Sequence, residues 1–397
     1  MCACRRIVSR IRPSEGDLAG QIRKRGDRTW LVRVYLGRDP ATGKRKWLSR
    51  TVHGTRRDAA SLLHSLLRDR DLGKLTIPSG MPLGEFAEKW LADVRGRVRP
   101  RTAAWYEDVL RRWILPVLGS RRLRDITPLD VQMVCQSLLE RGVPAAAEQA
   151  YRCLRAVFRQ AVKWSMLPKA PTDAVRPPRV PRREPRVLDP DQARRFLQAA
   201  REDRHWPLWW LLLETGMRPG EALALRWEDV DLERRVVYVR RALSQVRGQL
   251  VFEEPKTQKA RRGIPISEGL AEALREQRAR VEEMRARAGE LWEELDLVFP
   301  SEVGTPLRLD NLRGRSFRRI RERAGLPEGF RIYDLRHSSA TLLLLAEEHP
   351  KVVAERLGHA TVHMTLNTYS HLLPSLQQRA TEKLARMLQG GGVEKTQ

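Results

Sequence analysis

The stretch Glu214-Thr-Gly-Met-Arg218-Pro-Gly-Glu221 decides how the C-terminal half of this chain folds. An apolar run at residues 208–213 precedes it and is suited to a buried helix. A tight turn containing glycine then leads to Arg218, and a second helix is expected to begin near Pro219, because proline is tolerated in a first helical turn. We therefore expect Arg218 to be held at the joint between two helices. By itself, an arginine in such a place is more often a capping or ion-pairing residue.

Downstream, a lysine stands between short runs of β-prone residues. The runs at 236–240, 250–252 and 263–266 predict a small sheet on the side of a helical domain. The sequence Glu254-Pro-Lys256-Thr lies between the second and third runs, so Lys256 is expected on a hairpin turn from which it reaches into a groove. The alternative is a solvated charge, the usual role of lysine in a polar turn.

Three more motifs follow toward the C-terminus: Tyr333-Asp-Leu-Arg336-His337, Leu357-Gly-His359 and Asn367-Thr-Tyr369-Ser-His371. Asp334 is placed to cap the helix that continues after it, which would hold Arg336 near a helix start. Each of these residues is ordinary on its own. A tyrosine has a pKa of about 10 and stays protonated at neutral pH, so a lone tyrosine is rarely a nucleophile.

The N-terminal part, residues 1–77, is predicted to be a small domain with a sheet and one helix. Alternation of side chains predicts strands at 31–36 and 44–52, and apolar residues at helical spacing predict a helix over 55–71.

This first domain is strongly basic. Residues 1–80 contain 19 Lys and Arg against 7 Asp and Glu. The excess favours a DNA-binding role, although a structural domain with solvated charges is the alternative. Four candidate DNA contacts lie near its start: Arg23, Lys24, Arg25 and Arg28.

Residues 81–168 are predicted to form a domain of four helices around one core. Its third helix is expected to open on Thr127-Pro-Leu-Asp130, a threonine suited to an N-cap and a proline in the first turn. Apolar residues recur at three- and four-residue spacing in four segments: 83–94, 101–115, 127–140 and 145–167.

Residues 169–186 are predicted to be an extended, basic linker, because prolines with arginines between them disfavour a helix. Arg182 and Arg183 are candidate contacts to DNA phosphates. A solvated spacer whose arginines bind nothing is an equally good interpretation.

Together these patterns predict a mainly α protein with small β-sheets. A small α+β domain comes first and a helical domain second. The last domain, at 187–389, is predicted to be mainly helical with a small antiparallel sheet, and 390–397 a flexible tail. A chain of 397 residues is long enough for two or three such cores.

The net charge limits the classes of partner. Lys and Arg outnumber Asp and Glu by 75 to 49, giving +26, which favours a polyanion such as nucleic acid or an anionic membrane. No apolar run approaches the roughly 20 residues that span a bilayer, and the N-terminus lacks the apolar stretch of a secretory signal. We therefore expect a cytoplasmic protein associated with the nucleoid. The four cysteines form no disulfide framework and no spaced zinc site, so we expect them to be reduced.

The motifs occur in one order: Thr-Gly-Met-Arg-Pro-Gly-Glu, Pro-Lys-Thr, Asp-Leu-Arg-His, Leu-Gly-His and Asn-Thr-Tyr-Ser-His. This ordered set resembles the active-site signature of the tyrosine recombinases, the family of the phage-type integrases. The resemblance extends over the whole chain. The basic first domain is similar to an arm-type DNA-binding domain, and the four-helix segment to a core-binding, SAM-like domain.

The resemblance implies a role for each matched residue. Arg218 and Arg336 would clamp the scissile phosphate, and Tyr369 would attack it to form a 3′-phosphotyrosyl intermediate. Lys256 would protonate the leaving 5′ oxygen, and His359 would hydrogen-bond the phosphate or assist proton transfer.

Glu221 and Asp334 would have supporting roles. The chain departs from the family pattern at Tyr333, where many members have a histidine. A phenol is a poor proton acceptor at neutral pH but can donate a hydrogen bond to phosphate, so Tyr333 is expected to contact the phosphate without acting as a general base.

The same resemblance implies integration or excision of a mobile element such as a prophage. The partners would be double-stranded DNA at core and arm-type sites and three further copies of the chain in a homotetramer, with a DNA-bending protein and an excisionase as candidate accessory factors. No cofactor is expected: two arginines replace a metal, and the tyrosyl ester conserves the energy of the phosphodiester, so ATP is not needed.

Two other functions remain open at this point. A type IB topoisomerase would use the same chemistry to relax DNA as a monomer, although the arm-like first domain argues against it. A non-catalytic DNA-binding regulator would explain the charge but not the ordered motifs.

Overall fold

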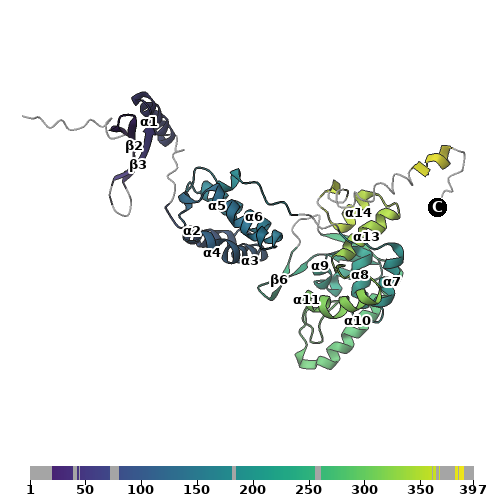
Figure 1. Cartoon of the computed structure of the whole chain (residues 1–397). Helices are drawn as coiled ribbons and strands as arrows, with labels where there is room; N and C mark the ends of the chain where they lie inside the picture. The colour runs from purple at the N-terminus through teal and green to yellow at the C-terminus, as the bar shows by residue number, and fades with distance from the viewer. Residues whose placement is uncertain are drawn as a thin grey trace, which may run out of the picture. The chain divides into compact units, whose positions relative to one another are not determined.

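The computed structural model describes residues 20–38, 43, 45–71, 80–180, 185–254, 261–359, 361–363, 366, 381–382 and 384–388. The chain divides into two compact units, Met1–Pro181 and Arg182–Gln397. The first unit contains a small sheet with one helix and a helical bundle, and the second is a larger, mainly helical unit (Figure 1). The predicted mainly α fold with small antiparallel sheets is confirmed.

The small sheet has three antiparallel strands, one of which the sequence pattern did not reveal. Successive side chains of a strand point to opposite faces, so Val32 and Val34 lie on one face, where both are fully buried. Helix α1 covers that face, because Leu63 packs directly over Gly20. The elements are β1 (Gly20–Gly26), β2 (Thr29–Arg38), β3 (Arg45–His53) and α1 (Arg56–Asp71), with strand order β1-β2-β3 and β1 as the strand not predicted.

The helical bundle encloses a core of its own, in which Phe86, Leu154 and Phe158 are fully buried. Thr127 caps the helix after it, since its side chain accepts from the Asp130 N–H and the Asp130 carboxylate accepts from the Thr127 N–H at 2.9 Å. The predicted N-cap and first-turn proline are confirmed. The helices are α2 (Leu83–Arg95), α3 (Pro100–Val109), a π-helical turn (Leu110–Ile114), α4 (Leu115–Leu118), α5 (Pro128–Glu140) and α6 (Pro144–Lys163).

Part of the predicted linker packs against this bundle instead of running extended. Pro171–Ala174 form a turn of 3-10 helix in which Pro171 and Thr172 are buried. The Tyr151 hydroxyl donates to the carbonyl oxygen of Val175 at 3.1 Å. The expectation of an extended chain was wrong here because proline is tolerated in the first positions of a short helical turn.

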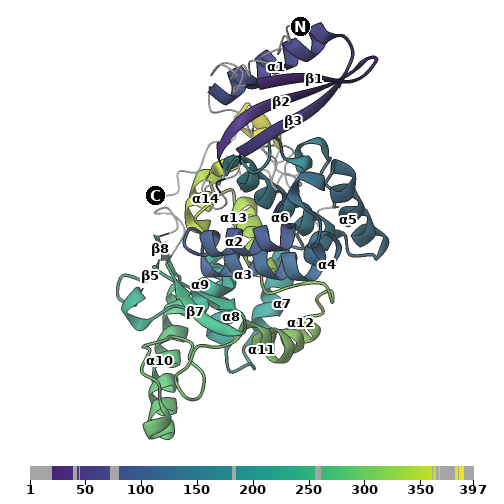
Figure 2. The ribbon, with the colours of Figure 1, turned by 90° about the vertical axis from the view of Figure 1, so that its left-hand side faces the viewer.

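The second unit is built around helix α8, which is apolar on most of its surface. Trp209 of α8 is fully buried and contacts Phe317, with ring centroids 5.6 Å apart. Helices α13 and α14 lie side by side and share a small apolar cluster that contains Leu344 and Leu357 (Figure 2). The helices of this unit are α7 (Pro190–Ala200), α8 (Trp206–Thr215), α9 (Pro219–Leu223), α10 (Glu268–Ala288), α11 (Leu309–Asn311), α12 (Arg318–Arg323), α13 (Asp334–Leu345) and α14 (Pro350–Leu357).

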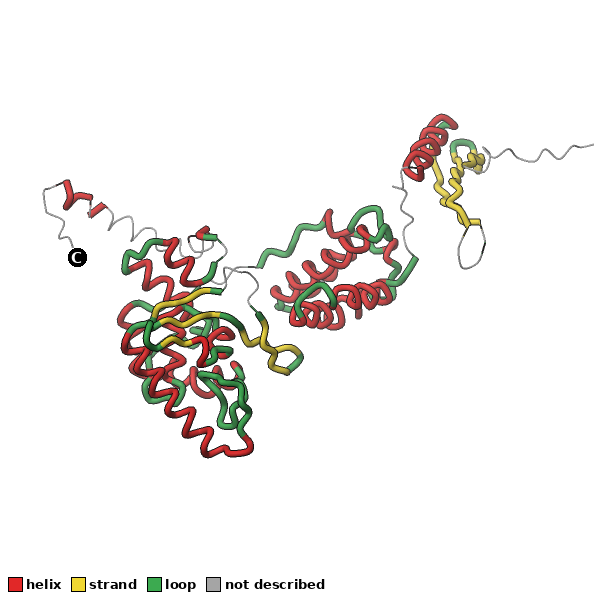
Figure 3. Tube along the Cα trace, turned by 180° about the vertical axis from the view of Figure 1, so that it is seen from behind, coloured by secondary structure: helices red, strands yellow, loops and turns green. Residues whose placement is uncertain are grey.

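The predicted β-prone runs fall into two sheets, not one (Figure 3). One sheet has the order β4-β5-β8 and the other pairs β6 with β7. The strands on either side of Lys256, β7 and β8, therefore have different partners, and the expectation that they form one hairpin was wrong. The strands are β4 (Val230–Asp231), β5 (Val236–Val239), β6 (Ala242–Val246), β7 (Gln249–Glu253) and β8 (Arg262–Pro265).

Within the described ranges, no helix is long and apolar enough to cross a bilayer. Cys135 and Cys153 are free, buried thiols of the bundle. Burial raises the pKa of Cys135 to about 11 and raises that of Cys153 further, so both stay as unreactive thiols. Cys2 and Cys4 lie outside the described residues.

Candidate active site

Helix α8 ends at Thr215, and Gly216 turns the chain toward Arg218. The φ of Gly216 is 64°, in the left-handed region that glycine adopts without strain. A Cβ at this position would lie 2.6 Å from Cδ2 of Leu357, the last residue of α14. Glycine therefore allows the ends of α8 and α14 to meet.

Arg336, on α13, fixes these two helix ends. Its side chain is 3% exposed, and it donates from Nη1 to the Gly216 carbonyl oxygen at 2.7 Å and from Nη2 to the Leu357 carbonyl oxygen at 2.8 Å. Burial, followed by repulsion from Arg218, lowers the pKa of Arg336 to about 10, so the guanidinium stays charged at neutral pH. Its orientation is set before any anion arrives.

Arg218 stands directly before α9 and is paired with Glu221. Arg218 Nη1 lies 2.7 Å from Glu221 Oε1, and the Arg218 N–H donates to Oε2 at 3.0 Å. Glu221 is 5% exposed, and burial raises its pKa. The attraction of Arg262 and Arg218 is stronger and holds the pKa of Glu221 below its ordinary value. The carboxylate is therefore ionised and orients Arg218.

His359 follows α14 and faces the same cluster. Its N–H donates to the Ala354 carbonyl oxygen at 2.9 Å. Burial, followed by repulsion from Arg336 and Arg218, lowers the pKa of His359 to about 4. The imidazole is therefore neutral at neutral pH, with one nitrogen that donates and one that accepts a hydrogen bond.

Tyr333 stands at the exposed edge of this cluster. Its side chain is 42% exposed, and its ring centroid lies 5.3 Å from that of His337, edge to face. Burial lowers the pKa of Arg218, but Glu221 and then Tyr333 raise it above its ordinary value. Tyr333 also offsets part of the lowering of the Arg336 pKa by burial and by Arg218, so its phenol lies near both guanidiniums. An anion that reaches the two arginines would also meet this phenol.

Asp334 does not cap α13 in the way expected. The helix begins at Asp334 itself, and no side chain caps its N-terminus. The fully buried carboxylate instead accepts from the Arg331 N–H at 2.8 Å and pairs with Arg331 Nη2 at 2.9 Å. Asp334 thus fixes the turn that leads into α13, two residues before Arg336.

Several predicted residues lie outside the described part of the chain: Lys256, Tyr369, Arg182 and Arg183. The structure brings together five of the predicted residues: Arg218, Glu221, Tyr333, Arg336 and His359. Asp334 fixes the turn that leads into α13. Sequence reasoning missed Arg262, which is 7% exposed at its side chain and donates from Nη2 to Glu221 Oε2 at 3.0 Å. Its sequence Arg-Arg-Gly before a β-prone run does not distinguish Arg262 from its neighbour.

The four candidate DNA contacts of the small sheet do not share one face. Arg23 is cross-strand from Leu31, on the face opposite α1, where Arg33 also lies. Lys24 is cross-strand from Trp30, on the α1 side, and it pairs with Asp27 at 3.8 Å. Arg25 and Arg28 are exposed near the turn between β1 and β2.

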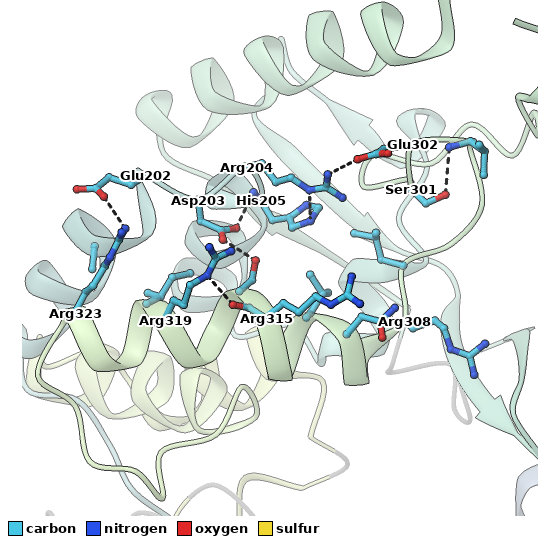
Figure 4. Close-up of a pocket in the computed structure, with 17 residues that line it drawn as sticks. Glu202, Asp203, Arg204, His205, Ser301, Glu302, Arg308, Arg315, Arg319 and Arg323 are labelled. Atoms are coloured by element: carbon cyan, nitrogen blue, oxygen red, sulfur yellow. Dashed lines mark hydrogen bonds and ion pairs between the residues drawn. The ribbon is translucent and has the colours of Figure 1, made fainter. Parts of the chain in front are cut away.

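A separate cavity of about 780 Å³ lies near the start of α8 (Figure 4). Two ion pairs compensate part of its positive charge. Arg323 donates to Glu202 at 2.6 Å, and Arg204 donates to Glu302 at 2.6 Å. None of the motif residues described above lines this cavity.

The cluster at the end of α8 is suited to hold a phosphate. Two guanidiniums with fixed orientation, a neutral imidazole and a phenol supply several hydrogen-bond donors to an anion that gains charge in a transition state. Among the residues with described positions, no group of three or more His, Cys, Asp or Glu could hold a metal ion.

Comparison with known proteins places these observations in a family context. Residues 186–375 match the model of the phage integrase family, and residues 83–139 match the N-terminal SAM-like domain of phage integrases. A prophage phiRv2 integrase of Mycobacterium tuberculosis is 30% identical over 78% of this chain and 79% of its own length. A XerC-like tyrosine recombinase of Caldanaerobacter subterraneus is 27% identical over 91% of this chain and 97% of its own. Among solved structures, the integrase of transposon Tn1549 in complex with transposon right end DNA superposes with a TM-score of 0.63 at 25% identity, over 77% of this chain and 100% of that one.

Proposed function

This chain belongs to the phage integrase family of tyrosine recombinases, and we propose that Tyr369 is the nucleophile with which it cleaves and rejoins DNA. It is a site-specific DNA recombinase of the integrase type. The observation that carries the assignment of its active site is the meeting of Arg218, Arg336 and His359 at the end of α8, from three segments that are far apart in the sequence.

The arrangement suits transfer of a phosphoryl group to a tyrosine. Attack by the Tyr369 oxygen places extra negative charge on the non-bridging oxygens, which Arg218 and Arg336 stabilise. Lys256 protonates the leaving 5′ oxygen, and His359 and Tyr333 hydrogen-bond the phosphate. The new 3′-phosphotyrosyl ester keeps the energy of the broken phosphodiester, so attack by a 5′ hydroxyl reverses the step without ATP.

The same chemistry does not require a metal, because fixed guanidiniums supply the positive charge that a bound cation supplies in other phosphoryl-transfer enzymes. Glu221 orients Arg218, and Asp334 supports the start of α13. The tyrosine of the motif Asn367-Thr-Tyr369 lies within the residues that match the family model.

The partner of the chain is DNA, which accords with its net charge of +26. We assign residues 81–168 to binding of the core site, 1–77 to an arm-type site and 187–389 to catalysis. Residues 169–186 join the domains at 81–168 and 187–389, and 390–397 form a tail. Recombination between two sites needs four active tyrosines, so we expect a homotetramer on synapsed DNA, assisted by a DNA-bending protein and an excisionase.

A nicked trap substrate tests this assignment. It is a duplex with the crossover junction, read from the DNA that flanks the gene, and a nick beside the scissile phosphate that releases the cleaved strand. The wild-type protein should form a covalent adduct in the presence or absence of EDTA, while Tyr369→Phe should bind the duplex and form none. An adduct with the variant would identify another nucleophile, and loss in EDTA would show that a metal is needed.

Relaxation of supercoiled DNA without strand exchange between two sites would identify a topoisomerase instead of a recombinase. If paired sites gave no recombinants while supercoiled plasmid was relaxed, the chain would act as a topoisomerase. Recombinant products from paired sites distinguish the two activities directly.

A further inference from the structure

Arg262 begins strand β8 and is buried beside the two clamping arginines. Its side chain is 7% exposed. Nη2 donates to Glu221 Oε2 at 3.0 Å, and Nε donates to the carbonyl oxygen of Arg356 at 2.6 Å. A buried guanidinium is costly unless it is paired and hydrogen-bonded, so both contacts stabilise this position.

The contact with Glu221 controls how much charge Arg218 can offer to a phosphate. Glu221 Oε1 accepts from Arg218 Nη1, whereas Oε2 is shared between the Arg218 N–H and Arg262. One carboxylate is thus divided between two guanidiniums. Without Arg262, the Glu221 carboxylate would pair only with Arg218. The net positive charge of these three side chains beside the phosphate would then fall by one.

The contact with Arg356 acts on the other side of the cluster. Arg356 and Leu357 are the last residues of α14 before the turn at Gly358. Arg262 holds the first carbonyl and Arg336 holds the second, at 2.8 Å. A Cβ at Gly358 would lie 2.9 Å from Arg262 Nη1, so the guanidinium packs directly against the turn that presents His359.

We propose that Arg262 is a positioning residue for strand cleavage, which shares the charge of Glu221 so that Arg218 stays cationic toward the phosphate and which holds the turn before His359. This inference rests on the proposed function. In this role Arg262 acts through Glu221 and the end of α14.

The charge of the phosphate itself provides the test. Full-length protein is mixed with the nicked trap duplex, and adduct formation is measured in single turnover with either a phosphodiester or a methylphosphonate at the scissile position. A methylphosphonate has no charge on its non-bridging oxygens and depends less on cationic stabilisation. Arg262→Met should slow the phosphodiester reaction by about tenfold or more and the methylphosphonate reaction much less.

Three further variants complete the experiment. Arg262→Gln removes the charge but keeps a hydrogen-bond donor, and it replaces Arg262→Met if that variant does not fold. It too should slow the phosphodiester reaction more than the methylphosphonate reaction. Arg262→Lys should restore most of the phosphodiester rate. The control is Arg261→Met, because Arg261 is 58% exposed and pairs with Glu254 at 2.9 Å; its rates should equal those of the wild type.

Equal losses on the two substrates would reduce Arg262 to a structural role and overturn the proposal, as would a wild-type phosphodiester rate in Arg262→Met. Failure of the wild-type protein to form any adduct would instead contradict the proposed function.

Discussion

The guanidinium of Arg336 donates to the carbonyl oxygen of Gly216 at 2.7 Å, across 120 residues of sequence. This bond joins the start of α13 to the end of α8, the point from which the chain turns to Arg218. Because the second bond of Arg336 goes to Leu357 at 2.8 Å, the clamp and the turn before His359 share one buried support. Changes at this support should act on catalysis more strongly than on DNA binding.

Replacement of Gly216 by alanine should disrupt that support. Alanine in the left-handed region costs about 1 kcal/mol, and its Cβ would also overlap Leu357 at 2.6 Å. With the cost of overpacking included, we expect a free energy of unfolding lowered by about 2–4 kcal/mol and an adduct rate lowered by at least about tenfold. Chemical denaturation and the trap assay measure the two effects.

Gly325 provides a matched control for this prediction. Its φ is also +64°, but a Cβ there would meet nothing within 4 Å. Gly325→Ala should therefore lose about 1 kcal/mol from backbone strain and keep its adduct rate. If the two variants lose the same stability and both stay active, the contact between Gly216 and Leu357 is not important.

The low pKa of His359 makes stability depend on pH. Burial and the nearby guanidiniums lower this pKa from 6.5 to about 4. Below pH 6.5 the unfolded chain binds a proton that the folded protein rejects, so stability should be full above this pH and should fall as the pH drops toward 4. The free energy of unfolding should therefore decrease between pH 7 and pH 5, and His359→Gln should reduce that decrease.

A variant at His205 provides a control that separates the pH dependence of stability from catalysis. Burial lowers its pKa to about 4 as well, but it lines the separate cavity near the start of α8. His205→Gln should also weaken the dependence of stability on pH while it keeps the adduct rate, whereas His359→Gln should lower that rate. An unchanged pH dependence in His359→Gln would show that His359 is not held neutral.

Helices of the bundle could be predicted from the sequence because apolar residues recur in them at helical spacing. The expected segment 127–140 corresponds to α5 (Pro128–Glu140), where the capping threonine and the proline mark the same start as the apolar pattern. Strand pairing was less predictable. The runs at 250–252 and 263–266 both favour strands, but β-propensity does not specify a partner, and β7 and β8 belong to different sheets.

The candidate site could be predicted as a set of residues but not as a geometry. Ordered motifs identified Arg218 and Arg336 through resemblance, whereas the bonds that orient them depend on backbone carbonyls of helix ends, which leave no residue signal. The burial of Arg262 could not be predicted from the sequence either. Arg261 and Arg262 are chemically identical neighbours, and the alternation of β8 alone decides which one is buried against Glu221.

Lys256 lies outside the described residues, and its role as general acid remains a prediction that leaving-group chemistry can test. Lys256→Ala should slow adduct formation on a normal 5′-oxygen leaving group by about 10²-fold or more. A 5′-thiol leaves without protonation, so a bridging phosphorothiolate should restore most of the rate. Arg218→Ala is the control, since its loss should persist on the thiol substrate. Absence of rescue would remove Lys256 from the acid role.

The small sheet should bind DNA through the face opposite α1, which carries Arg23 and Arg33. Each phosphate contact that is removed lowers the slope of log K against log salt by about 0.9 for duplex DNA. Arg23→Gln and Arg33→Gln should therefore each reduce the slope measured on DNA with arm-type sites. Lys24→Gln is the matched control, because Lys24 is cross-strand from Trp30 on the α1 side and pairs with Asp27. If Lys24→Gln reduced the slope as much as Arg23→Gln, the open face would not be the DNA-binding surface, and the charge of the whole domain would act without a preferred side.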